Sequence, residues 1–99
     1  MDIVKTATAG TLESCDAAVT VEPAAGALEI RIEGGDARFA SRVRAAAEAA
    51  LAELGVAAAR VTIRDRSALD CTVRARVLAA CLRAAGRESS DKLPWEYLR

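Results

Sequence analysis

The chain has 99 residues, enough for one small domain and too few for two independent cores. Its 14 Lys and Arg balance 14 Asp and Glu, so the totals exclude a generic polyanion-binding protein with a large excess of positive charge. The absence of histidine excludes Ser-His-Asp triads, Cys-His dyads and histidine-containing zinc sites. Much of the usual chemistry of small enzymes is thereby removed.

The cysteine count and the hydropathy pattern predict the location. Three cysteines without a CxxC spacing specify neither a disulfide framework nor a metal site, and they fit a reducing, cytoplasmic compartment. The long alanine-rich stretch is interrupted by Glu48 and Glu53. We therefore expect no signal peptide, no membrane span, no bound metal and no nucleic-acid partner.

The first third of the chain predicts three strands. Small and β-branched residues at 6–12 lead into the polar residues 13–16, and Val19 and Val21 then alternate with polar neighbours, which indicates a hairpin with Ser14 near its tip. After a Pro- and Gly-containing turn, apolar and charged residues alternate over residues 27–33. This pattern places Leu28, Ile30 and Ile32 on one buried face.

The rest of the chain predicts a helix, a strand and a second helix. Asp36 is placed to cap the first helix, which Gly55 ends, and Asp70 is placed to cap the second, which Gly86 ends. Residues 60–65 alternate as a strand between them. The apolar positions of the first helix are Phe39, Val43, Ala46, Ala47, Ala50, Leu51 and Leu54, and those of the second are Val73, Val77, Ala80, Cys81 and Ala84.

The β-β-β-α-β-α order predicts an α+β two-layer sandwich, in which two helices pack on one face of a mainly antiparallel sheet. We expect a single domain over residues 1–99, with residues 87–99 as a C-terminal tail. Because the tail holds Trp95 between Leu93 and Leu98, it is predicted to pack on the domain rather than on a partner.

Charge is segregated along the chain. Residues 1–36 contain seven acids and two bases, whereas residues 60–87 contain seven arginines and two aspartates. This basic segment is interpreted either as a surface for phosphate or an acidic partner, or as an ordinary solvated face. The arginines are Arg60, Arg64, Arg66, Arg74, Arg76, Arg83 and Arg87.

Reactive groups gather in the predicted hairpin turn, where Ser14 and Cys15 are flanked by Glu13 and Asp16. A serine without a positioned base is a poor nucleophile, so intrinsic hydrolase activity is not expected. An exposed serine is still a good attachment point for another enzyme, although serine also occurs often as an ordinary turn residue. Cys15 is interpreted as a small tolerated residue, and Cys71 and Cys81 as packing residues of one helix.

Three segments together carry a resemblance. They are residues 10–16 (Gly-Thr-Leu-Glu-Ser-Cys-Asp), 68–77 (Ala-Leu-Asp-Cys-Thr-Val-Arg-Ala-Arg-Val) and 93–96 (Leu-Pro-Trp-Glu). With their spacing and the chain length, they resemble the acyl carrier (gamma) subunits of citrate lyase over essentially the whole chain. Fatty-acid acyl carrier proteins are excluded, because their Asp-Ser-Leu tripeptide does not occur here.

The resemblance implies a non-catalytic carrier. Ser14 would hold, through a phosphodiester, a phosphoribosyl dephospho-CoA arm (2'-(5''-phosphoribosyl)-3'-dephospho-CoA) whose thiol carries acetyl and citryl thioesters. The implied partners are the citrate lyase alpha subunit, an acyl transferase, and the beta subunit, a citryl lyase. A prosthetic-group transferase and an acetylating ligase would act transiently. The net reaction would convert citrate to acetate and oxaloacetate in the cytoplasm of a citrate-fermenting bacterium.

Some alternatives stay open. The acyl carrier subunit of malonate decarboxylase is thought to use the same type of arm, and a non-covalent adaptor with an arginine face is a different class of function.

Arg74 and Arg76 are predicted to contact phosphates or partners, but they lie about 160° apart on a helix and cannot both face one ligand. Cys15 departs from the family, in which glycine or serine is common at this position.

Overall fold

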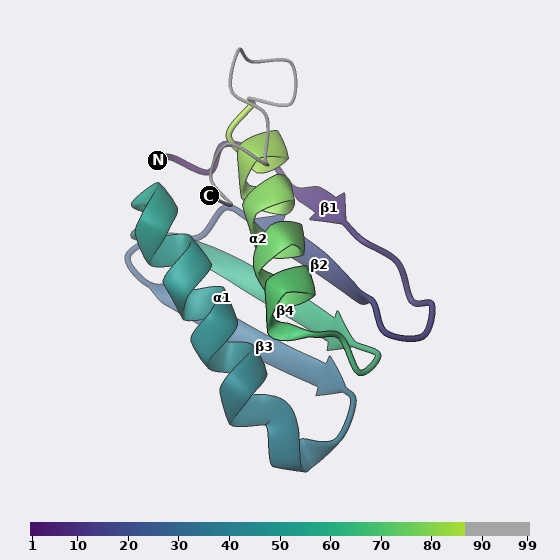
Figure 1. Ribbon diagram of the computed structural model, residues 1–99. Helices are drawn as coiled ribbons and strands as arrows, with labels where there is room; N and C mark the ends of the chain where they lie inside the picture. Colours follow the sequence, from purple (N-terminus) through teal and green to yellow (C-terminus); the bar gives the residue numbers. More distant parts are fainter. Residues whose placement is uncertain (87–99) are drawn as a thin grey trace.

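The computed structural model describes residues 1–86. The predicted order of strands and helices is confirmed, with one short 3-10 turn, η1, added before the first helix (Figure 1). The packing predicted for the tail around Trp95 lies outside the described residues. The elements are β1 (Ala7–Ala9), β2 (Ala17–Glu22), β3 (Leu28–Gly34), η1 (Ala37–Phe39), α1 (Ala40–Leu54), β4 (Ala59–Asp65) and α2 (Asp70–Ala84).

The four strands form one sheet in the order β1-β2-β4-β3. β1 pairs with β2 and β2 with β4 in antiparallel orientation, whereas β3 and β4 are parallel. A parallel pair needs a crossover, and α1 provides it. Both helices lie on the same face of the sheet (Figure 1). The α+β sandwich with a mainly antiparallel sheet is thus confirmed.

The core lies between the sheet and the two helices. Alternate residues of β2 and β4 point toward the helices and are completely buried, as Val19 and Ile63 illustrate. Leu51 of α1 and Val77 and Leu78 of α2 meet them from the other layer and are also completely buried. Burial of each such side chain stabilises the fold by roughly 1.5–3 kcal/mol, so this core holds the strand ends in place.

Two apolar residues are more exposed than the sequence pattern predicts. Leu28 is 39% exposed because β3 is an edge strand, and the prediction of a fully buried face there is wrong. Phe39 is 43% exposed because it ends η1 instead of joining the buried stripe of α1. Its ring lies 5.6 Å and 4.8 Å from the guanidinium carbons of Arg38 and Arg42, two cation–π contacts.

The predicted helix caps are confirmed in part. Asp36 accepts a hydrogen bond from the backbone of Arg38 and so caps η1, and Gly55 ends α1 with a left-handed conformation. Asp70 does not cap α2, because it is the first residue of that helix and its carboxylate forms an ion pair with Arg42 at 2.9 Å.

The acidic and basic parts of the chain are brought together by strand pairing. Because β3 and β4 are neighbours, Arg60 bonds to Glu29 at 3.3 Å and Arg64 pairs with Glu33 at 3.5 Å on the face away from the helices. The arginines of β4 therefore do not form an uncompensated basic face.

Strand direction collects several loops at one end of the sheet, which we call the Ser14 end. It comprises the β1–β2 turn (residues 10–16), η1 and the β4–α2 loop (residues 66–69), because β1 ends there, β2 starts there, and β3 and β4 both finish there (Figure 1). Both helices also begin at this end. The predicted hairpin with Ser14 near its tip is confirmed.

Candidate functional site: a bulged turn that presents Ser14

The β1–β2 connection closes with a tight turn and a β-bulge. The carbonyl of Glu13 accepts a hydrogen bond from the Asp16 N–H at 3.1 Å, so Ser14 and Cys15 are the two central residues. The Cys15 N–H donates to the Arg66 carbonyl at 2.7 Å, and the Arg66 N–H donates to the Asp16 carbonyl at 3.0 Å. Two residues of the turn thus oppose one residue of the β4 side, which is the arrangement of a bulge.

Cys15 is the strained residue of this bulge. Its φ of 64° is left-handed, the conformation that glycine adopts most easily at the first position of such a bulge. Bulges redirect side chains and interrupt regular pairing. Here the bulge leaves Ser14 exposed beyond the last paired residues of the hairpin.

Gly10 allows the other side of the turn to pass close to β2. Its φ is 92°, and a Cβ atom built there would lie 1.8 Å from the carbonyl oxygen of Ala17. No side chain fits at that separation, so the position requires glycine. The path of the chain into the Ser14 turn is therefore fixed by backbone contact.

Asp16 ties the turn to α2. Its carboxylate accepts hydrogen bonds from Arg76 Nε at 2.9 Å and Nη2 at 3.0 Å, from Thr11 Oγ1 at 2.7 Å and from the Ala17 N–H at 2.7 Å. The bonds from Arg76, and then the bond from Thr11, hold the pKa of Asp16 well below its usual range. The Asp16 side chain is only 13% exposed, so this ionised carboxylate anchors the turn.

The two hydroxyl groups of the turn, those of Thr11 and Ser14, differ in their hydrogen bonding. Thr11 Oγ1 donates to Asp16 and accepts from the Glu13 N–H at 3.2 Å, so it is part of the turn's scaffold. Ser14 is exposed, and its hydroxyl makes no hydrogen bond within residues 1–86. Of the two, only the Ser14 hydroxyl is available for attachment without breaking a bond of the turn.

Comparison with known proteins decides the family. The family described as the malonate decarboxylase delta subunit (MdcD) matches residues 4–84. Relatives named citrate lyase acyl carrier protein include that of Streptococcus uberis, 46% identical over 99% of this chain and 95% of the relative. Those of Cronobacter sakazakii (43%, 100% of both chains) and Lacticaseibacillus casei (40%, 99% and 95%) are similar in extent. The chain belongs to the citrate lyase acyl carrier protein family.

In this member of the citrate lyase acyl carrier protein family, the two candidate arginines of α2 point in different directions. Arg74 bonds to Glu53 of α1 at 2.6 Å, and Arg76 bonds to Asp16 of the Ser14 turn. These bonds to carboxylates of different elements agree with the expected angular separation of the two arginines. Both carboxylates come from segments distant in sequence from the arginines, and no local pattern indicated them. Their contact with phosphates or partners stays a prediction.

The cysteines of this family member lie in three different environments. Cys81 is completely buried, which raises the pKa of its thiol to about 12, and its predicted packing role is confirmed. Cys71 is exposed on α2, so the packing prediction is wrong for it, and Cys15 is exposed in the turn. A thiol with such a raised pKa stays protonated at neutral pH, which excludes Cys81 as a nucleophile.

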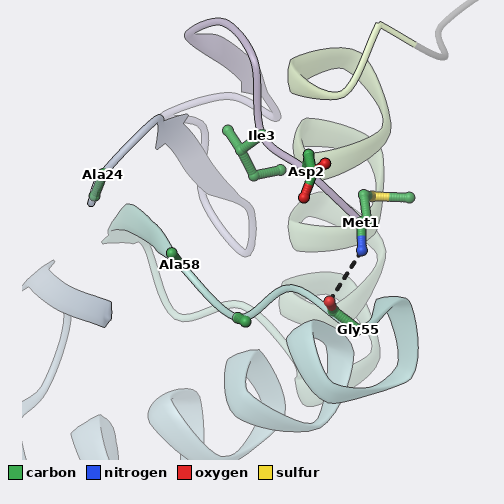
Figure 2. Close-up of a pocket in the computed structure, with 7 residues that line it drawn as sticks. Met1, Asp2, Ile3, Ala24, Gly55 and Ala58 are labelled. Carbon is green, nitrogen blue, oxygen red and sulfur yellow. Dashed lines mark hydrogen bonds between the residues drawn. The ribbon is translucent and has the colours of Figure 1, made fainter. Parts of the chain in front are cut away.

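Figure 2 shows a pocket of about 210 Å³. Its lining residues follow β2 and precede β4, which places it at the end of the sheet opposite the Ser14 turn. Ala24, just after β2, and Ala58, just before β4, line it together with the N-terminal residues. The Met1 ammonium group donates a hydrogen bond to the Gly55 carbonyl at 3.0 Å beside the pocket (Figure 2). This pocket is therefore separate from the Ser14 turn.

Two other kinds of site are absent from the described part of the chain. Within residues 1–86, no three His, Cys, Asp or Glu side chains are grouped so that they could hold a metal ion. No helix among these residues has the length and apolar character needed to cross a membrane. The turn around Ser14 is thus the candidate site.

Substitution of Cys15 by glycine is expected to stabilise the protein by about 0.5–1 kcal/mol, because glycine relieves the left-handed strain. Urea unfolding under reducing conditions measures this change. Cys15→Ala is the matched control, since it removes the thiol but keeps the Cβ atom, and we expect no comparable gain. Equal stabilisation by both variants would assign the effect to the thiol and contradict the strain argument.

Proposed function

We propose that this chain is the acyl carrier subunit of a citrate lyase and that Ser14 carries a covalently attached phosphoribosyl dephospho-CoA arm. The observation that carries the proposal is the exposed Ser14 hydroxyl, free of hydrogen bonds within residues 1–86, on a turn whose Thr11 hydroxyl and Asp16 carboxylate are both hydrogen-bonded. The citrate lyase relatives supply the class of cargo.

The turn fits an attachment site for such an arm. Ser14 projects from a bulge held by backbone bonds to Arg66 and by the Asp16 carboxylate, so the attached group extends into solvent without displacing a packed side chain. When bound, the arm supplies a terminal thiol that holds acetyl and citryl groups as thioesters. The chain's own residues present and orient this arm.

Attachment requires a base from another protein. The carboxylate nearest in sequence to Ser14 on its C-terminal side, Asp16, is held ionised by Arg76 and has a low pKa, which makes it a weak proton acceptor. The chain has no histidine to replace it, and the exposed Glu13 carboxylate on the other side of Ser14 makes no hydrogen bond to the Ser14 hydroxyl. We infer that a dedicated transferase removes the Ser14 proton while the hydroxyl oxygen bonds to phosphorus and the leaving group of an activated phosphate donor departs.

The carrier role explains why the domain needs no catalytic groups. A tethered thioester stays near the active sites of the alpha (acyl transferase) and beta (citryl lyase) subunits, which raises its effective concentration there. An acetylating ligase would restore the acetyl group of the arm. We place this assembly in the cytoplasm.

A carrier for malonate decarboxylase is a second candidate, because the matching family has that description. The same type of arm is expected in citrate lyase and in malonate decarboxylase, so the mass of the arm does not distinguish the two carriers. The subunits that co-purify with the chain from its native host distinguish the two systems. Citrate-dependent release of acetate by the purified assembly supports the citrate lyase assignment, and malonate-dependent release of carbon dioxide supports the alternative.

The first test is the intact mass of the chain purified from native, citrate-grown cells under non-reducing conditions. We expect an added mass equal to the phosphoribosyl dephospho-CoA arm, and peptide mapping across residues 11–21 places it on Ser14. A bare chain from these cells would contradict the carrier proposal. The adaptor hypothesis, in which the arginines bind an acidic partner, would then be tested by measuring partner binding after charge reversal at Arg74 and Arg76.

A further inference from the structure

Arg66 is the residue that pairs with the Ser14 turn from the β4 side. Its carbonyl accepts from Cys15 and its N–H donates to Asp16, so its Cα atom lies directly across from the bulge. Ser14 is the next residue along the turn. Long side chains reach diagonal neighbours across paired strands, which are about 7–8 Å away. The backbone therefore fixes Arg66 within side-chain reach of Ser14.

The guanidinium group of Arg66 also has no bonding partner among residues 1–86. It is exposed and makes no hydrogen bond or ion pair within residues 1–86. By contrast, Arg76 is bonded twice to Asp16, and Arg64, two residues earlier on β4, is paired with Glu33. Among these three arginines near the turn, Arg66 alone keeps all its N–H donors available to a ligand at Ser14.

A phosphodiester on Ser14 would add negative charge to the turn, and a nearby guanidinium group would compensate it. A phosphodiester adds a negative charge at Ser14, next to the exposed carboxylate of Glu13. The carboxylate of Asp16 is already compensated by Arg76. A forked guanidinium group suits phosphate oxygens through charge-assisted hydrogen bonds, and an arginine at position 66 would offset the added charge.

We propose that Arg66 binds the phosphodiester that joins the arm to Ser14, while Arg76 positions the turn through Asp16. This inference rests on the proposed function, since it requires a phosphate on Ser14. It assigns the phosphate contact to a residue of the β4–α2 loop instead of the two arginines of α2. The arm's first atoms would then be held against the domain, and its motion would begin beyond the phosphate.

The test uses the full chain, labelled with nitrogen-15 and isolated in bare and loaded forms. We expect the Nε–H resonance of Arg66 to shift downfield on loading, and the phosphorus-31 resonance of the diester to move in Arg66→Gln. Arg31→Gln is the matched control, because Arg31 is also exposed and without a partner in residues 1–86 but lies within β3 at the far edge of the sheet. Arg66→Lys, which keeps the charge but loses the fork, should give a smaller phosphorus shift.

The outcomes separate the two proposals. If the wild-type chain carries a phosphorus signal on Ser14 and neither the Arg66 resonance nor the phosphorus resonance of Arg66→Gln moves, the Arg66 contact is refuted and the carrier function stands. If Arg76→Gln moves the phosphorus resonance and Arg66→Gln does not, the Arg66 contact is likewise refuted, and the shift reflects the position of the turn that Arg76 holds through Asp16. Absence of any phosphorus signal in the native loaded preparation refutes the proposed function itself.

Discussion

Replacement of Ser14 by alanine is expected to abolish attachment of the arm and, with it, all citrate cleavage by the assembled complex. The fold should be retained, because Ser14 is exposed and its hydroxyl makes no hydrogen bond within residues 1–86. Substitutions at such positions usually change the free energy of unfolding by less than about 0.5 kcal/mol. Intact mass, citrate-dependent acetate release and urea unfolding measure the three quantities.

Two other exposed serines serve as controls for this result. Ser41 lies in the first turn of α1, and Ser67 lies in the β4–α2 loop at the same end of the sheet as Ser14. Ser41→Ala and Ser67→Gly should both load fully; glycine is chosen at position 67 because Ser67 has a φ of 63°. Loading that survives Ser14→Ala, or disappears in Ser67→Gly, would place the attachment on a different hydroxyl.

The regular elements were predictable because their burial follows local periodicity. The alternation in β2 and β4 and the apolar stripes of α1 and α2 matched the observed burial at most positions. The errors have tertiary causes. Leu28 is exposed since its strand is at an edge, and Phe39 is exposed since η1 changes the helical phase before α1 begins. Neither the strand order nor a 3-10 turn is encoded in a simple period.

The candidate site was predictable only as a segment. The sequence placed Ser14 in a turn and its resemblance implied attachment at this serine, but the link between Asp16 and Arg76 joins residues 60 positions apart. No local pattern indicates such a contact. The resemblance implied glycine or serine at the position of Cys15 without indicating a bulge, and the left-handed φ found there suits glycine.

Asp16→Asn is expected to destabilise the protein by about 1–2 kcal/mol at neutral pH. The substitution keeps the size of the side chain but removes the charge that binds Arg76, and an amide NH₂ group replaces one acceptor oxygen. The half-exposed surroundings of Arg76 limit the effect, because water partly replaces the lost partner. Urea unfolding of the bare chain measures the difference.

The difference in stability between the wild type and Asp16→Asn should become smaller as the pH falls through the acidic range. The pKa of Asp16 in the folded protein lies well below its value in the unfolded chain, which is about 3.9 for an ordinary aspartate. Its contribution to stability is therefore complete above that unfolded pKa and is lost progressively as pH falls toward the folded pKa. The wild type should lose most, but not all, of its advantage over Asp16→Asn as the pH falls from about 4.5 to about 2.

The matched control is Asp36→Asn, which removes another carboxylate that is hydrogen-bonded to an arginine. Asp36 and Arg38 are far more exposed, with side-chain exposures of 40% and 81%, so water can replace the lost bonds and the change in stability should be much smaller. If Asp16→Asn behaved like Asp36→Asn, and its deficit did not shrink in acid, the backbone bonds to Arg66 would be sufficient to hold the turn. Arg76 would then have no positioning role, and Ser14 would be presented by the bulge alone.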